Sequence, residues 1–191
     1  MNFTAKLHSG PITQASYPAL VIPVYDDGAI PRDIAELDKL WKGAITKALR
    51  HDVLTKKEEV YILSNPVGKG IDRIAFIGMG LMNECDSESL RRASAIAANA
   101  LRKRDVRRIC FLVEPFVSDG GDIVHTGMTL VEGARLGSYV FDNFKSEKDK
   151  QPIETVELHF PKNVNAKEIM EHLDKVIILT SSTILARDWA N

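Results

Sequence analysis

The chain has 191 residues with a formal net charge of -1, and hydrophobic residues make up 45% of it. These values are typical of one α/β domain, or of one domain with an appended helix, and they argue against a strongly basic nucleic-acid binder. Only two cysteines, no apolar signal-peptide core and no apolar run of membrane-span length together predict a cytoplasmic protein without a disulfide framework.

The amino-terminal part predicts three strands and one helix. Residues 3–7 alternate apolar and polar side chains, as in a half-buried strand, and ALVIPV (19–24) predicts a buried strand whose Pro23 indicates an edge or a strand end. A helix is expected to begin near Pro31, with its apolar face formed by Ile34, Leu37, Trp41, Ile45 and Leu49. VYILS (60–64) predicts a third strand, antiparallel to the next one because a Pro/Gly turn follows it.

The centre of the chain predicts a βαβ unit. RIAFIGMG (73–80) and RRICFLVE (107–114) are nearly continuous in apolar residues, as strands covered on both faces are. The helix between them spans 87–104, with Asp86 as its N-cap and basic residues in its last turn. The two strands are therefore expected to be parallel and joined by a right-handed crossover.

The last part predicts a helix, a strand and a long helix. The helix at 128–144 contains glycines that need a packing reason, such as close approach to the sheet, because each costs about 1 kcal/mol relative to alanine. TVELHF (155–160) alternates and predicts a strand near the edge. From Ala166, after a capping-box-like Asn165 and Glu168, apolar residues recur at helical spacing over about 25 residues, or ~37 Å. One sheet face of this domain needs less length than that.

Two glycine-rich turns are candidate ligand sites. Gly78 and Gly80 follow a strand and could hold a phosphate, but a dinucleotide fingerprint needs a third glycine where Asn83 stands. The loop Ser118–Asp122 is also rich in glycine, as are ADP-ribose loops in macro domains. A structural turn is the favoured interpretation at both places, because a lone Gly-x-Gly is weak support for a nucleotide. We therefore assign no catalytic or cofactor-binding residue and keep Gly78 and Gly80 as weak candidates.

Metal and nucleic-acid sites are not expected in this chain. Its five histidines (His8, His51, His125, His159 and His172) form no close pair and no compact cluster with cysteine. Asp26 and Asp27 are interpreted as turn formers, and Ser181 and Ser182 fall on a helix rather than on a nucleophile elbow. The basic run 102–108 could contact phosphates, but such a run is usually a helix end followed by a solvated strand start.

Two segments in the last third of the chain resemble the leucyl aminopeptidase (cytosol aminopeptidase) family. EGARLGSYVFDNFKS (132–146) is similar to the family segment that precedes the domain junction; the matching residues are Glu132, Gly133, Leu136, Gly137, Tyr139, Phe141, Asp142, Lys145 and Ser146. ILARDWAN (184–191) is similar to the Ala-Arg-Asp-Leu-x-Asn signature at the entry to the catalytic domain, with Trp189 in place of the usual leucine. The order of the earlier elements also fits the family.

This resemblance implies the fold and the role of the chain. The fold expected is an α/β class, three-layer α/β/α sandwich with a mixed sheet, macro-domain-like, at residues 1–165. A long connecting helix, 166–191, would then lead to a catalytic domain that the sequence does not contain. In the family that domain holds two divalent metals, usually zinc, manganese or magnesium, and assembles as a hexamer. Its metal-binding carboxylates and catalytic lysine have no counterpart in these residues.

The function expected is therefore that of a non-catalytic N-terminal domain of a leucyl aminopeptidase, a metallo-exopeptidase that removes N-terminal residues from peptides. Its role would be assembly and control of access to the active sites, with the catalytic domain of the same chain as partner. The alternatives are a macro-like module that binds a nucleotide derivative such as ADP-ribose, or nucleic acid, and a structural domain without a ligand. Neither a membrane partner nor a cofactor of its own is expected.

Overall fold

The computed structural model describes residues 3–28, 31–53, 55–118, 120–141, 151–160 and 164–190. Its strands are β1 (Thr4–Ser9), β2 (Leu20–Tyr25), β3 (Val60–Ser64), β4 (Arg73–Gly80), β5 (Arg108–Leu112) and β6 (Thr155–Phe160). Its helices are α1 (Arg32–Leu40), α2 (Ala44–His51), α3 (Ser87–Arg102), α4 (Ile123–Gly137) and α5 (Ala166–Ala190), with short 3-10 turns at Ile12–Gln14, Met82–Glu84 and Glu114–Phe116.

The strands form a single mixed sheet of six strands in the order β1-β6-β5-β2-β4-β3. All neighbouring pairs are parallel except β3 and β4, which are antiparallel as their connecting turn predicts. The two strands of the predicted βαβ unit, β4 and β5, run in the same direction but are not neighbours, because β2 lies between them. The α/β class and the mixed sheet are thus confirmed.

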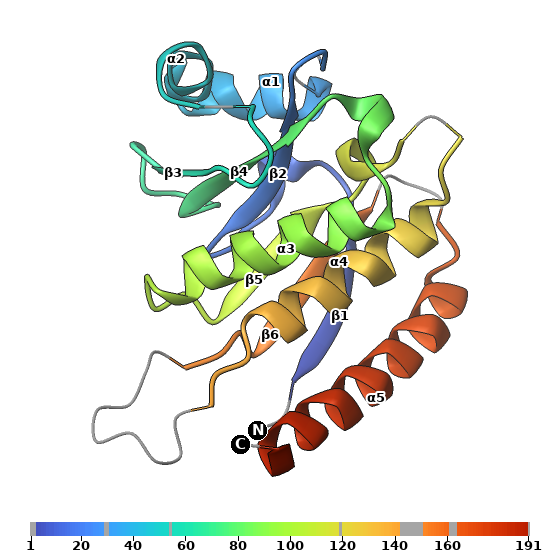
Figure 1. Cartoon of the computed structure of the whole chain (residues 1–191). Coiled ribbons are helices and arrows are strands. Elements are labelled where there is room, and N and C mark those ends of the chain that lie inside the picture. The colour runs from blue at the N-terminus through green and yellow to red at the C-terminus, as the bar shows by residue number, and fades with distance from the viewer. Residues whose placement is uncertain are drawn as a thin grey trace.

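Helices cover the two faces of the sheet unequally (Figure 1). On one face α3 and α4 lie over the sheet, and their apolar side chains pack on Ala75, Phe111 and Leu158, while α5 lies beside α4 and β1. On the other face α1 and α2 bury Ile34, Trp41 and Ile45 against β2 and β4. Over β1 and β6 that second face carries polar side chains instead, so the second helical layer is shorter than the first.

The prediction of one continuous helix from Pro31 onward is wrong. The segment forms two helices, because Lys42 and Gly43 adopt left-handed backbone conformations with φ of 55° and 80°. The carboxylate of Asp38 then accepts hydrogen bonds from the amides of Ile45 and Thr46, at 2.8 and 3.2 Å, and stabilises the start of α2. The apolar spacing continues through the break, so periodicity alone does not reveal it.

Other boundaries and caps follow the sequence more closely. Asp86 caps α3, accepting from the amide of Ser89 at 2.7 Å, as predicted. The helix expected at 128–144 instead begins at Ile123, capped by Asp122, and ends at Gly137. The β-branched run at 176–185 is helical, inside the 25 residues of α5. No helix in the described part of the chain is both long and apolar enough to cross a membrane.

Candidate functional site at the carboxy-terminal helix

The two segments that resemble the family contact each other at the end of α5. The Tyr139 hydroxyl donates a 2.5 Å hydrogen bond to the carboxylate of Asp188. The Arg187 guanidinium lies 5.8 Å from the centroid of the Tyr139 ring and donates to the Leu136 carbonyl at 3.2 Å. Residues some fifty positions apart in the sequence therefore hold the end of α5 against the end of α4 and the residues that follow it.

Arg135 attaches the middle of α5 to the domain. Its guanidinium donates to the Ile177 carbonyl at 2.8 Å and to the Ser181 hydroxyl at 2.7 Å, and it lies 4.5 Å over the ring of Phe3. Burial lowers the pKa of this guanidinium, but arginine stays charged at any physiological pH. Beside it, Phe3, Tyr139 and Asp188 border one hollow of about 280 Å³, so the first and last described segments lie together.

The glycines of the first segment allow α4 to approach α3 closely. A Cβ atom at Gly133 would collide with the Ser94 hydroxyl and the Arg91 carbonyl, and one at Gly137 would collide with Ala95. The expected packing reason is therefore confirmed for these two glycines, although the partner is α3 and not the sheet. Gly127, before the predicted helix, does face the sheet, and a Cβ there would lie 3.0 Å from the Phe160 ring. In the same interface Glu132 accepts from the Arg91 guanidinium at 3.0 Å.

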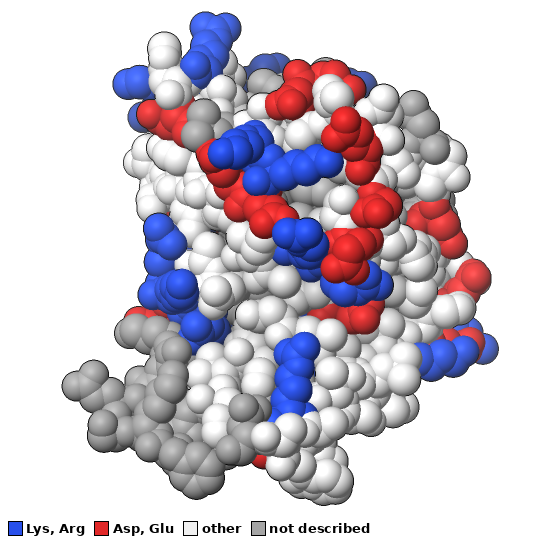
Figure 2. All heavy atoms as spheres, in the orientation of Figure 1, with Lys and Arg blue, Asp and Glu red and all other residues white. Residues whose placement is uncertain are grey.

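The outward side of α5 is apolar in its carboxy-terminal half. We call Ile178, Leu179, Leu185 and Trp189 the outward stripe; their exposed fractions are 64%, 67%, 48% and 81%. One to two turns earlier the same side carries Glu171, Asp174 and Lys175. Exposed apolar groups clustered in this way mark interaction surfaces. Figure 2 shows uncharged surface over the end of α5, whereas charges of both signs alternate over α3.

The weak candidates Gly78 and Gly80 do not offer free amides. The amide of Gly78 donates to the Glu59 carbonyl and that of Gly80 to the Thr55 carbonyl, both at 2.8 Å. Gly80 has a φ of +73°, and the side chain of Lys57 packs against it. A phosphate cradle needs several unpaired amides, so these glycines are better explained as the turn at the end of β4.

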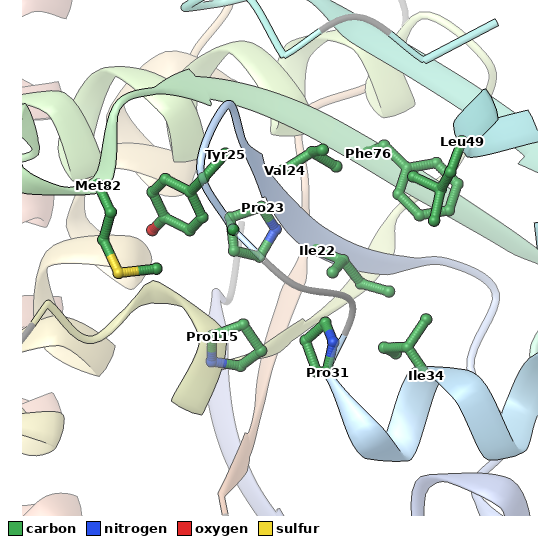
Figure 3. Close-up of a pocket in the computed structure, with 11 residues that line it drawn as sticks. Ile22, Pro23, Val24, Tyr25, Pro31, Ile34, Leu49, Phe76, Met82 and Pro115 are labelled. Atoms are coloured by element: carbon green, nitrogen blue, oxygen red, sulfur yellow. The ribbon is translucent and has the colours of Figure 1, made fainter. Parts of the chain in front are cut away.

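A crevice does lie at the carboxyl end of β2, where ligands of open α/β sheets often bind (Figure 3). It opens because the pairing of β2 with β5 stops after Val21, and Pro23 stands just beyond that point. Its walls are apolar, with Ile22, Pro23, Pro31, Phe76 and Pro115 around a volume of about 110 Å³. Among the described residues no charged side chain lines it, so the crevice does not favour a nucleotide derivative as ligand.

The side chain of Asp122 stabilises the end of the second glycine-rich loop, residues 118–122. Asp122 accepts from the amides of Val124 and His125 at the start of α4, at 2.7 and 3.3 Å. Two aspartate caps, Asp86 and Asp122, therefore occupy the neighbouring starts of α3 and α4, where an anion would otherwise bind. Position 119 lies outside the described residues.

The histidines do not gather into a metal cluster among the described residues, and two arginines of the basic run bond within the domain. Among the residues that the structure describes, no three His, Cys, Asp or Glu side chains converge to hold a metal ion. The basic run is engaged internally: Arg104 donates to the Ala100 carbonyl at 3.0 Å and Arg107 to Glu154 at 3.2 Å. Arg102 is 5% exposed and donates to Asn99.

Comparisons with known proteins give the family of the chain. The sequence profile "Cytosol aminopeptidase family, N-terminal domain" matches residues 21–148. The chain belongs to this family. The "Probable cytosol aminopeptidase" of Persephonella marina is 27% identical over 191 residues, 97% of this chain and 38% of that protein. The protein of the same name from Geotalea uraniireducens is 30% identical over 165 residues, 85% of this chain and 32% of that protein.

Solved structures show the same fold. A mutant of tomato leucine aminopeptidase has a TM-score of 0.77 at 20% identity, over 98% of this chain and 38% of that chain. The bottromycin maturation enzyme BotP has a TM-score of 0.65 at 16% identity, over 92% of this chain and 33% of that chain. The chain thus spans roughly a third of the length of its cytosol aminopeptidase relatives.

The sequence identified the family segments but not the contacts between them. Tyr139 and Asp188 each matched the family, yet no pattern in the sequence predicts that they bond to each other. The role of Arg135, which binds α5 and Phe3, had no sequence signal either. Asp142, Lys145 and Ser146 of the first segment lie outside the described residues.

Proposed function

We propose that this chain is the non-catalytic N-terminal domain of a cytoplasmic, metal-dependent leucyl aminopeptidase, and that it serves assembly and limits access to the active sites. The observation that carries the proposal is the contact between the two family segments, Tyr139 with Asp188 and Arg187 with Leu136, at the end of the last helix. Proteins named as probable cytosol aminopeptidases extend well beyond the length matched by this chain, which supports a further domain in the native protein.

The outward stripe is the proposed contact surface for that catalytic domain. Its four apolar side chains lie in the last turns of α5, where the following domain would begin, and not in the charged first half of the helix. Burying apolar surface contributes about 25 cal/mol for each Å² removed from water. The catalytic domain would cover Leu185 and Trp189, and the hexamer expected for the family would form through the complete protein.

The proposed chemistry belongs to that other domain. Two divalent metals, zinc, manganese or magnesium, would there activate a water molecule for attack on the first peptide carbonyl of a substrate. The residues described here do not fit such a centre, because a metal needs three or four convergent donors and no three converge among them. We assign this chain no step of the reaction.

The test is to express the reading frame that encodes this chain together with whatever follows Asn191. We expect a longer protein that hydrolyses leucine p-nitroanilide and forms an oligomer. Leu185→Asp in the outward stripe should weaken both properties, whereas Met170→Asp, an equal change at a 38% exposed position of the same helix outside the stripe, should not. Light scattering and hydrolysis rates report the two effects. A frame that closes at Asn191, or a Leu185→Asp protein identical to wild type, contradicts the proposal.

A further inference from the structure

A second hollow, of about 390 Å³, lies on the polar part of the sheet that α1 and α2 leave uncovered. Its floor comes from three adjacent strands: His8 of β1, Glu157 and His159 of β6, and Arg108 of β5. The segment between β1 and β2 forms the wall, with Pro11, Ala15 and Tyr17. Neither the family segments nor the proposed function makes use of this hollow.

The Glu157 carboxylate is the unusual group in it. Its side chain is 3% exposed, and the basic nitrogens nearest to it, His8 Nε2 and Arg108 Nε, stand 3.7 and 3.8 Å from Oε1. Both distances exceed a hydrogen bond, and the bonds of the neighbouring groups, Tyr17 with His159 and His159 with Gly10, do not involve this carboxylate. Its oxygens are open to the hollow, since the buried polar side-chain atom found without a partner among the described residues is Arg73 Nε. A buried carboxylate is strongly unfavourable unless donors reach its oxygens. The hollow, which Glu157 borders, is where those donors can come from.

Two other polar side chains of the hollow, His159 and Tyr17, already have partners. His159 Nε2 lies 2.7 Å from the Gly10 carbonyl, which can only accept, so Nε2 carries the proton and Nδ1 accepts. The Tyr17 hydroxyl, 3.0 Å from Nδ1, is therefore the donor in that bond. The guanidinium of Arg108, in contrast, has Glu157 at 3.8 Å as its partner among the described residues, and its side chain is 45% exposed.

The hollow thus places a negatively charged acceptor, the Glu157 carboxylate, beside a positively charged donor, the Arg108 guanidinium. We propose that it binds the zwitterion of a free α-amino acid, whose ammonium group donates to Glu157 and whose carboxylate accepts from Arg108. Arginine suits this role because its guanidinium can meet a carboxylate with two parallel hydrogen bonds. The amino-acid side chain extends toward Pro11 and Ala15. A phosphate would place negative charge against Glu157, and a simple amine would leave Arg108 without an anion.

The binding itself is independent of the aminopeptidase proposal. A titration of the 191-residue chain therefore tests the site even if the chain proves to have no peptidase partner.

The experiment is a nitrogen-15 NMR or calorimetric titration with L-leucine, L-alanine, N-acetyl-L-leucine and L-leucinamide. We expect saturable binding of the two free amino acids, with shifts at His8, Arg108 and Glu157. The N-acetyl compound lacks the ammonium group and the amide lacks the carboxylate, so each should bind at least about tenfold more weakly. Equal binding of all four, or no saturable binding at millimolar concentration, overturns the proposal.

Two matched pairs of variants locate the site. Glu157→Gln and Arg108→Gln should each lower the affinity for L-leucine at least about tenfold. Glu154→Gln and Arg107→Gln remove the same charges from a neighbouring ion pair outside the hollow, at 3.2 Å, and should leave the affinity unchanged. Thermal melts show whether each protein is folded. Because the Arg108 side chain is 45% exposed, its replacement disturbs the fold less than that of Glu157, and its variant tests the proposal even if Glu157→Gln unfolds. Equal affinities within both pairs also overturn it.

Discussion

His159 makes the stability of the domain depend on pH. It is 4% exposed, and its burial lowers the pKa of the imidazole below the usual value. The folded protein therefore holds the neutral ring while the unfolded chain takes up a proton near pH 6.5. This contribution to stability is complete above that pH and is lost as the pH falls toward the lowered pKa. The loss is about 1.4 kcal/mol for each unit between the two pKa values.

The prediction is that the free energy of unfolding in urea decreases between pH 8 and pH 5.5 more steeply for the wild-type chain than for His159→Gln. The exposed His51 provides the control, and His51→Gln should keep the wild-type slope. If the curves of wild type and His159→Gln run parallel, the pH dependence comes from another group.

Gly133 is required by the close approach of α4 to α3. Gly133→Ala places a methyl group against both the Ser94 hydroxyl and the Arg91 carbonyl, so we expect a loss of about 1–3 kcal/mol in the free energy of unfolding. The double change with Ser94→Gly should recover little, because the backbone carbonyl remains in place. A Gly133→Ala protein at least as stable as wild type, by urea denaturation, would show that α3 and α4 can move apart freely.

At the scale of the elements, the two tryptophans report opposite environments. Trp41 is 2% exposed under α1, whereas Trp189 is 81% exposed at the end of α5. Using Trp→Phe variants to separate them, acrylamide should quench Trp189 strongly and Trp41 weakly in a dilute sample. Protection of Trp189 that grows with protein concentration would mean that two copies pair through the outward stripe. Protection equal to that of Trp41 in a dilute monomer would contradict the exposed position.

The elements were predictable where local pattern and tertiary environment agree. The buried runs of β4 and β5, the Asp86 cap and the helical period through α5 all appear in the sequence because each depends on neighbouring residues. The break between α1 and α2 does not appear in the sequence pattern, since it depends on the hydrogen bond between the Asp38 carboxylate and the Ile45 amide. The fold of α5 along α4 also depends on a distant residue, Arg135, and so its contacts could not be read from periodicity.

The candidate sites also combine features that the sequence shows with features that only the folded structure shows. Gly78 and Gly80 have the residue type of a phosphate loop, but their amides are used by Glu59 and Thr55, which the sequence does not place beside them. Glu157 was predicted only as one polar position of an alternating strand. Its position between His8 and Arg108 is a property of three strands together, and it becomes visible only in the assembled sheet. The domain boundary at 165/166 and the macro-domain-like character stay predictions.

For the whole molecule, we expect no hydrolysis of leucine p-nitroanilide by the purified 191-residue chain with zinc or manganese added. The reason is that the described residues offer no set of three convergent ligands. The measurement compares the rate with that of a chelator control, and a purified leucine aminopeptidase serves as the positive control. Hydrolysis by the 191-residue chain above the chelator rate would require a metal centre within these residues.

The shared hollow of Phe3 and Asp188 has a consequence for the connectivity of the domain. Since both ends of the described chain meet there, a short glycine-serine linker could join them, and the chain could be opened instead at the exposed turn between Val67 and Gly68. Such a circular permutant keeps every strand pair of the sheet and should unfold as cooperatively as the original. Because its two ends lie close together, the domain could also be inserted into a surface loop of another protein. The outward stripe would then lie beside the junction.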